Sequence, residues 1–114
     1  MTLCALVPLW FNTMCRIAGI ASPSLPLAEI QQKVKAMCQV QRHGGPDGEG
    51  FFWSPEHNLV LGHRRLAILD LKESGRQPMH YAGDRYTISY NGEIYNYREL
   101  KEELRSHGYN FRSE

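Results

Sequence analysis

The chain has 114 residues, of which 42% are apolar and 22% are charged, a composition typical of one soluble domain. It excludes collagen-like, coiled-coil and wholly disordered chains. The net charge is +1, from 13 basic and 12 acidic residues, so neither a nucleic acid nor a membrane is expected as a partner.

Residues 1–13 differ from the rest of the sequence. The run from Leu3 to Phe11 is apolar, but Pro8 interrupts it, and it is far shorter than the roughly 20 residues of a membrane-spanning helix. A secretory signal would begin with basic residues, yet the first charge is Arg16. We interpret residues 1–13 as an extension that either belongs to the protein or results from a start set too early, with Met14 as the true initiator. The second interpretation is preferred.

Residues 15–50 predict a strand, a helix and a loop. The apolar run 15–21 predicts a buried strand that ends at a turn rich in serine and proline. A helix is expected next, over residues 25–40 with Ser24 as its N-cap, because apolar residues recur there at helical spacing. The members of this stripe are Leu27, Ile30, Val34, Met37 and Cys38. Four glycines and a proline within residues 41–50 predict a loop whose backbone adopts conformations closed to other side chains.

The second half predicts further strands and one more helix. Short β-prone runs separated by polar turns are typical of antiparallel strands, and they cover residues 51–53, 58–62, 66–71 and 85–90. Asn96 and Glu99 have the spacing of a capping box at a helix start, and Gly108 is suited to the C-terminal cap. The expected buried stripe of that helix is Tyr97, Leu100 and Leu104. Residues 110 and 111 predict the start of another strand, so we expect an α+β fold.

Cys15 is a candidate nucleophile. If Met14 is the initiator and is removed, Cys15 carries a free α-amine. An α-amine has a pKa of about 8 and a thiol has a pKa of about 8.5, so the amine can accept the thiol proton without a partner histidine. On residue type alone, a small buried residue on a strand is the more common arrangement. Both interpretations stay open at this point.

Two further segments carry groups suited to bind a substrate. Asn91 and Gly92 allow a tight turn at which a backbone N–H and an amide side chain point into one space and can hold an oxyanion; a plain turn is the alternative. Arg64 and Arg65 precede an apolar run and face opposite sides of it, so only one of them can enter a given pocket. An inward guanidinium needs a carboxylate partner, and two solvated arginines are the alternative.

No metal or cofactor site is predicted in this chain. The five histidines include no i, i+4 pair, and the glycine-rich loop lacks both the spacing of a dinucleotide fingerprint and the lysine of a P-loop. Three cysteines without a CxxC spacing argue against a disulfide framework and against structural zinc. They favour a reducing, cytoplasmic location.

Four motifs, in this order, resemble those of the glutaminase domain of glutamine-hydrolysing asparagine synthetases. They are MCRIAGI, RHGGPDGEG, LGHRRLAILDL with RQPM after it, and YNGEIYNYREL. The resemblance covers residues 14–114 and indicates a partial class II amidotransferase domain of the N-terminal-nucleophile type. It implies a four-layer αββα sandwich, here incomplete at the C-terminus and without the synthetase domain of the family.

The resemblance also implies a role for each candidate residue. Cys15 corresponds to the nucleophile that attacks the side-chain amide of L-glutamine and releases glutamate and ammonia. Asn91 and Gly92 correspond to the oxyanion hole. Arg65 corresponds to the clamp for the substrate α-carboxylate, and Glu93 to a residue near the substrate amino group. The pocket wall corresponds to the backbone of Leu66, Ile68 and Leu69.

In the family, a second domain uses ATP and magnesium to activate aspartate and receives the ammonia. ATP and magnesium are therefore expected only in the synthetase domain, outside this chain. Four departures from the family pattern stand out: the residues before Cys15 make its nitrogen an amide, Arg16 replaces a glycine, Gly44 replaces an arginine, and a family aspartate would follow Glu114. Two alternatives stay open: a catalytically inert fragment or interaction module, and the glutaminase of another class II amidotransferase with a different acceptor. No oligomeric state is predicted.

Overall fold

The computed structural model describes residues 14–68 and 73–111 and has a mixed α+β fold. Its elements are β1 (Arg16–Ala21), α1 (Leu27–Val40), β2 (Gly48–Ser54), β3 (Leu59–Arg65), a short 3-10 helix (Glu73–Gly75), β4 (Met79–Tyr81), β5 (Tyr86–Ile88) and α2 (Tyr97–Ser106). Both predicted helices and the strands predicted near 15–21, 51–53, 58–62 and 85–90 are confirmed. The extension 1–13 lies outside the described residues.

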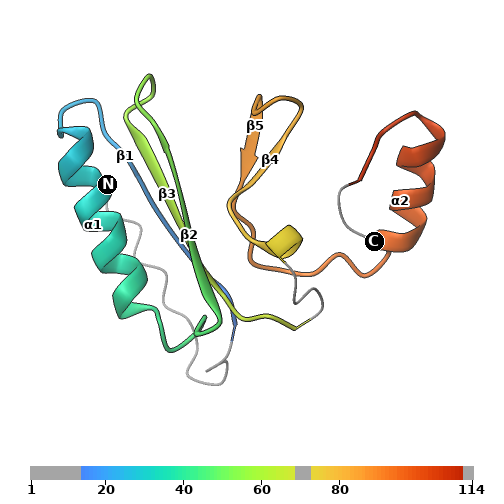
Figure 1. Cartoon of the computed structure of the whole chain (residues 1–114), viewed down its shortest axis with the longest axis horizontal. Helices are drawn as coiled ribbons and strands as arrows, with labels where there is room; N and C mark the ends of the chain where they lie inside the picture. Colours follow the sequence, from blue (N-terminus) through green and yellow to red (C-terminus); the bar gives the residue numbers. More distant parts are fainter. Residues whose placement is uncertain (1–13, 69–72, 112–114) are drawn as a thin grey trace.

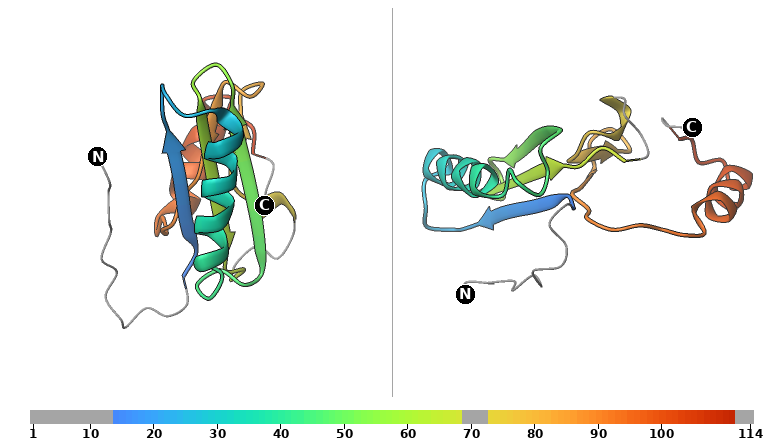
Figure 2. Two further views of the ribbon diagram at one scale, coloured as in Figure 1. Left: turned by 90° about the vertical axis from the view of Figure 1, so that its left-hand side faces the viewer. Right: turned by 90° about the horizontal axis from the view of Figure 1, so that it is seen from below.

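Figure 1 shows the elements in the order α1, a three-stranded sheet, the β4–β5 hairpin and α2. The first sheet has the order β1-β3-β2, and the second consists of β4 and β5. Helix α2 stands clear of the hairpin when the molecule is seen from below (Figure 2). The described residues therefore establish a mixed α+β fold with small antiparallel sheets, and they do not form a complete sandwich.

Strand β3 is the centre of the larger sheet and pairs antiparallel with both neighbours. His63 lies opposite Ile17 of β1 and Gly50 of β2. Because successive side chains of a strand point to opposite faces, β3 carries two different sets of residues. Val60, Gly62 and Arg64 share one face, and Leu61, His63 and Arg65 share the other.

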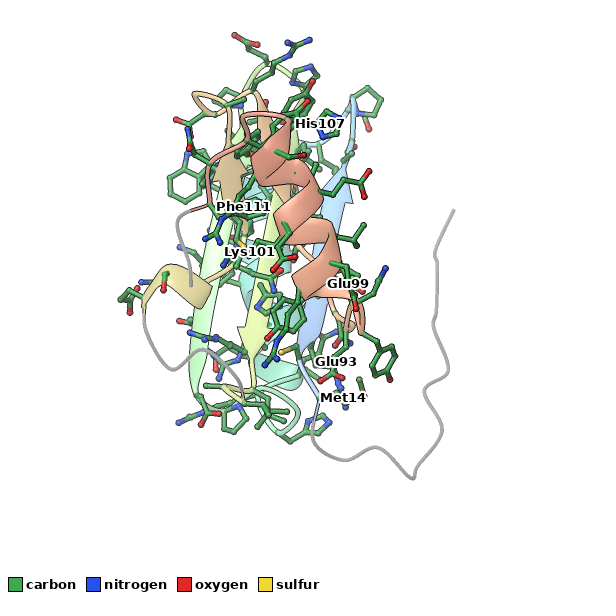
Figure 3. All side chains as sticks on the ribbon, turned by 90° about the vertical axis from the view of Figure 1, so that its right-hand side faces the viewer. Met14, Glu93, Glu99, Lys101, His107 and Phe111 are labelled. Carbon is green, nitrogen blue, oxygen red and sulfur yellow. The ribbon has the colours of Figure 1, made fainter. Side chains whose placement is uncertain are left out.

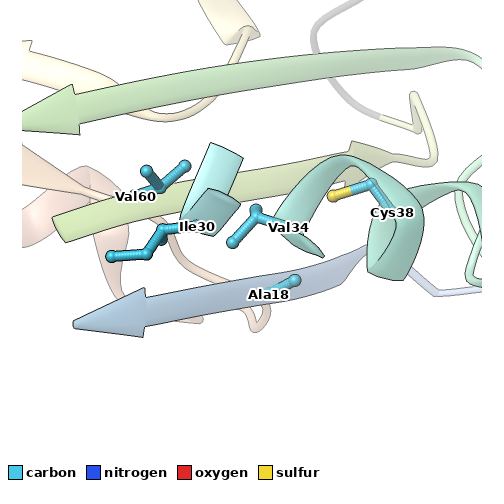
Figure 4. Close-up of a cluster of buried hydrophobic side chains, with 5 residues drawn as sticks. All are labelled: Ala18, Ile30, Val34, Cys38 and Val60. Carbon is cyan, nitrogen blue, oxygen red and sulfur yellow. The ribbon is translucent and has the colours of Figure 1, made fainter. Parts of the chain in front are cut away.

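Helix α1 covers the first of these faces and forms the hydrophobic core with it. Figure 4 shows the core residues Ala18, Ile30, Val34, Cys38 and Val60. The three helical members recur every four residues, so they lie on one side of α1. A Cβ atom at Gly62 would lie 2.5 Å from Cys38 Sγ, which means that the helix packs directly on the backbone of β3. Burial raises the pKa of the Cys38 thiol, and the thiol stays protonated and unreactive in the core.

Two details predicted for α1 are wrong. The helix begins after Pro26, and Ser24 is not its cap; instead, Ser22 Oγ accepts the N–H groups of Ser24 and Leu25 at 3.3 and 3.2 Å. Met37 is 39% exposed, whereas Ile30, Val34 and Cys38 are fully buried. The sheet contacts a narrower strip of the helix than the apolar pattern indicated, because Met37 lies one position to the side of the i, i+4 row.

The glycine-rich segment 41–50 is only partly a loop. Gly48 to Gly50 belong to β2, and no glycine of the segment has a positive φ. The need for glycine comes from close approach instead: a Cβ atom at Gly45 would collide with the backbone of Arg64. The prediction of unusual backbone conformations was wrong here, and the small size of glycine is the physical reason for its presence.

The β4–β5 hairpin was not fully predicted. Its turn has positive φ at Ala82, Gly83 and Asp84, and the ring of His80 lies 5.4 Å from that of Phe52, which connects the hairpin to β2. Residues 66–68 were expected to be part of a strand but are irregular, and 69–71 lie outside the described residues. The backbone N–H groups after β3 are instead used by Cys15 and Asp47, as described below.

Helix α2 begins at Tyr97, as the sequence indicated, and ends in a Schellman motif. Gly108 has φ 85°, its N–H donates to Arg105 O at 2.9 Å, and the N–H of Tyr109 donates to Leu104 O at 3.0 Å. The Asn96 side chain makes no capping hydrogen bond, and the expected buried stripe is wrong, because α2 has no buried residue. Residues 110 and 111 are irregular rather than a strand.

Candidate active site

Cys15 lies immediately before β1, and its sulfur contacts the backbone that follows β3. The N–H of Leu66 donates to Cys15 Sγ at 3.3 Å, and Sγ lies 3.6 Å from Leu66 O as a donor. Cys15 is partly buried and forms no disulfide. The thiol of Cys15 is thus held against the backbone of Leu66 from both its donor and its acceptor side. The predicted nucleophile is therefore adjacent to the segment predicted to bind the substrate.

The two arginines at the end of β3 face opposite sides, as predicted. Arg64 is 5% exposed; its Nε donates to Gly45 O at 2.9 Å, and its Nη1 lies 2.8 Å from Glu49 Oε2. This satisfies the requirement that an inward guanidinium meet a carboxylate. Arg64 is thus occupied by structural contacts with Gly45 and Glu49, and Arg65 lies on the other face of β3.

Arg65 lines a pocket of about 240 Å³ on the face away from α1. The other lining residues are Asp47, Gly48, Glu49, His63, Glu73, Arg76 and Gln77. Arg76 donates to Glu49 O at 3.2 Å and to Glu73 Oε2 at 3.4 Å, so its charge is partly balanced. The pocket brings basic and acidic groups together, as a site for an amino acid with a carboxylate and an ammonium group requires, but neither Cys15 nor Leu66 is among its lining residues.

Asp47 holds the segment after β3, a role that the sequence analysis missed. Its N–H donates to Arg65 O at 3.0 Å, and its Oδ2 accepts the N–H of Ala67 at 2.9 Å. These bonds on either side of Leu66 fix the backbone that contacts Cys15. No signal in the sequence indicated this pairing, because Asp47 and Ala67 are 20 residues apart in the chain.

His63 is buried in the pocket wall, at 1% exposure, and among the described residues no hydrogen bond of normal geometry reaches either ring nitrogen, although the Tyr90 backbone lies close to the ring. Burial lowers the pKa of His63, the Tyr90 backbone opposes this shift, and the charge of Arg65 adds to it. The imidazole is therefore neutral at pH 7. The sequence had assigned no function to this histidine.

Asn91, Gly92 and Glu93 are exposed on the connection between β5 and α2. The preceding residues 87–89 line a hollow of about 390 Å³ together with β1 and β3, and Met14 and Glu93 lie toward the same end of the molecule (Figure 3). Among the described residues, no hydrogen bond connects Asn91, Gly92 or Glu93 to Cys15. Neither Asn91 nor Gly92 has the positive φ expected for the turn.

The predicted pocket wall is divided. The backbone of Leu66 contacts Cys15, whereas Ile68 is 67% exposed and Leu69 lies outside the described residues.

Within the ranges 14–68 and 73–111, no helix is long and apolar enough to span a membrane. In the same ranges, no three side chains of His, Cys, Asp or Glu are grouped as a metal site would require.

Comparison with known proteins gives a consistent result. Residues 14–114 match the family model described as a glutamine amidotransferase domain. The chain is 41% identical over 103 residues to asparagine synthetase (glutamine-hydrolysing) 1 of Bacillus subtilis and 43% identical over 100 residues to asparagine synthetase 3 of the same organism. It is 34% identical over 90 residues to asparagine synthetase B of Escherichia coli.

These alignments cover 89%, 86% and 79% of this chain and 16% of each relative. The chain therefore spans about a sixth of the length of the curated relatives it matches. No solved structure matches it.

Proposed function

Because the chain belongs to the family of glutamine amidotransferase domains, we propose that it hydrolyses L-glutamine to glutamate and ammonia for an asparagine synthetase. One observation carries the proposal: the Cys15 thiol is hydrogen-bonded to the backbone of Leu66, the residue directly after Arg65. A nucleophile and a cation that can hold a carboxylate thus occupy neighbouring positions.

In the proposed reaction, the Cys15 thiolate attacks the side-chain amide carbon of glutamine. The resulting oxyanion collapses to a thioester, and the amide nitrogen leaves as ammonia after it accepts a proton. Water then attacks the thioester, which restores the thiol and releases glutamate. The base is the α-amine of Cys15, which accepts the thiol proton and donates it to the leaving nitrogen. This step requires a chain that begins at Cys15, because an amide nitrogen is not basic.

The roles of the other residues are part of the proposal. Arg65 binds the α-carboxylate of glutamine, and its place in the pocket wall supports this. Asn91 and Gly92 stabilise the oxyanion, and Glu93 binds the substrate ammonium. The exposure of this tripeptide leaves its polar groups available to a ligand. The backbone of Leu66, Ile68 and Leu69 completes the wall.

The acceptor reaction belongs to the part of the relatives that this chain does not cover. We propose that a synthetase domain there uses ATP and magnesium to amidate aspartate with the ammonia, and that the complete glutaminase domain is the four-layer sandwich. An inert fragment is favoured instead if the residues before Cys15 are retained, because they block its nitrogen. A different acceptor would require a different second domain.

The experiment compares two chains, one of 114 residues and one that begins at Cys15 after removal of Met14. Each is incubated with L-glutamine labelled with ¹⁵N in the side chain, and released ammonia is measured. We expect release only from the chain that begins at Cys15, and none from its Cys15→Ala variant. Equal release from both chains would refute the α-amine mechanism, and release from the Cys15→Ala variant would refute the assignment of the nucleophile.

A further inference from the structure

We propose that Gln77 is a positioning residue that holds Tyr90 and, through it, the Asn91–Gly92 segment. The inference rests on the proposed function for the role of that segment as the oxyanion hole, but none of its contacts involves the residues before Cys15. Gln77 Oε1 accepts the N–H of Tyr90 at 2.5 Å, across 13 positions of the chain. Because Gln77 also lines the pocket that contains Arg65, this bond connects the pocket to the residue directly before Asn91.

Gln77 is itself fixed against β2. A Cβ atom at Gly50 would collide with the carbonyl oxygen of Gln77, so the main chain of Gln77 lies directly on the backbone of this strand. Gly50 is buried, and the neighbouring Arg76 donates from Nε to Glu49 O at 3.2 Å. Since β2 is paired along its length with the central strand β3, the Gln77 side chain extends from a well-anchored part of the molecule.

The phenol ring of Tyr90 extends this constraint to Gly92. A Cβ atom at position 92 would lie 2.5 Å from Tyr90 Oη and 2.7 Å from Tyr90 Cζ. Real Cβ atoms essentially never come within 3.0 Å of such atoms, so a side chain at position 92 would displace the ring. The Tyr90 backbone also lies close to the buried ring of His63. Tyr90 therefore contacts the pocket wall through its backbone and Gly92 through its ring.

The consequence is a defined position for the donors of the proposed oxyanion hole. Such donors stabilise an oxyanion only when they lie about 2.7–3.1 Å from it. Asn91 and Gly92 are exposed, so burial of their own atoms does not fix them. Without the Gln77 side-chain amide, Tyr90 and the two residues after it would sample more positions, and the donors would be in place less often. Gln77 therefore acts on the reaction through Tyr90.

The first test measures amide hydrogen exchange by NMR in the ¹⁵N-labelled chain of 114 residues. Gln77→Met keeps the length of the side chain and removes the acceptor. We expect it to accelerate exchange at Tyr90 about three- to tenfold, the effect of losing one hydrogen bond, and to shift the α-proton resonances of Gly92 as the ring moves away. Gln77→Glu keeps an acceptor and should preserve both signals. Gln32→Met, on an exposed position of α1, is the matched control.

The second test measures glutamine hydrolysis by the chain that begins at Cys15. We expect Gln77→Met to lower kcat about ten- to hundredfold and to change KM less than about twofold, because the oxyanion forms only after glutamine is bound. Gln77→Glu should keep kcat near the value of the unsubstituted chain. A purely structural role for Gln77 would not separate kcat from KM in this way.

The amides of β3 report on the fold in the first test and should exchange at unchanged rates. An unchanged rate at Tyr90 in Gln77→Met would overturn the proposal, as would an increase at β3 as large as that at Tyr90. Faster exchange at Tyr90 with an unaltered kcat would also overturn it, as would equal losses of kcat in Gln77→Met and Gln77→Glu. If the unsubstituted chain that begins at Cys15 releases no ammonia, the proposed function fails, and the first test still decides whether Gln77 holds this segment.

Discussion

Glu49→Ala should destabilise the three-stranded sheet far more than Arg64→Met, although both substitutions break the same ion pair. The two partners differ in their surroundings: the Arg64 side chain is 6% exposed, and that of Glu49 is 41% exposed. Removal of the carboxylate leaves a charged guanidinium in the interior. Removal of the guanidinium leaves a carboxylate that water already reaches.

The size of each effect follows from this asymmetry. Without Glu49, the Gly45 carbonyl is the remaining acceptor of Arg64 among the described residues. Glu49→Ala should therefore lower the free energy of opening by about 3 kcal/mol, the lower end of the range for breaking a buried ion pair. Arg64→Met keeps an apolar stem of similar length and loses one neutral acceptor, at about 1 kcal/mol. The two variants should therefore differ by about 2 kcal/mol in the free energy of opening.

The assay is alkylation of Cys38, which requires α1 to separate from β3. Since a factor of ten corresponds to about 1.4 kcal/mol, we expect Glu49→Ala to accelerate the reaction roughly 150-fold and Arg64→Met roughly fivefold. Glu49→Gln keeps an acceptor without the charge and should lie between them. If Arg64→Met accelerates alkylation as much as Glu49→Ala does, the guanidinium is solvated in solution and the reasoning from burial is wrong.

Three further predictions concern the core and the site. Because burial lowers the pKa of His63, the unfolded chain binds a proton that the folded chain does not bind as the pH falls below about 6.5. The midpoint of thermal unfolding should therefore fall between pH 7.5 and pH 5.5, and it should fall less in the His63→Gln variant. An equal fall in both proteins would contradict the assignment. Gly62→Ala should lower the free energy of unfolding, measured in urea, by about 1 to 3 kcal/mol, because the added methyl group would collide with Cys38 and Val34. Adding Cys38→Ala should restore part of the lost stability. If it restores none, the strain lies elsewhere. In a protein that joins this domain to a synthetase domain, Cys15→Ala should abolish asparagine synthesis from glutamine and leave synthesis from added ammonia intact, and loss of both would show that the cysteine serves another purpose.

The regular elements could be predicted because their signals are local. The four-residue spacing of Ile30, Val34 and Cys38 defines a helix and its buried side before any partner is known. Gly108 ends α2 for an equally local reason, its positive φ. The burial of α2 could not be predicted, because an apolar stripe shows which side can be buried and not whether another element covers it.

The site was predictable in part. The motifs led us to expect functional roles for Cys15 and Arg65, which stay predictions, and the structure brings Cys15 against the residue after Arg65. The bonds of Asp47 to the segment after β3 connect positions about 20 residues apart, and no spacing rule in a single sequence indicates such a pairing. Residues 66–68 look like a strand by composition, but their N–H groups bind a sulfur and a carboxylate instead of a neighbouring strand.

The central position of β3 has a consequence for laboratory evolution of this domain. Its alternation places Arg64 toward the core and Arg65 in the pocket, and both of its edges are paired. Deleting or inserting a single codon near the start of residues 59–65 would exchange the two faces for every residue beyond the change. The imidazole of His63 would then enter the core, and Arg65 would leave the pocket face and be replaced there by Arg64. Libraries built by point substitution can sample this strand, whereas libraries that vary its length should yield poorly folded clones.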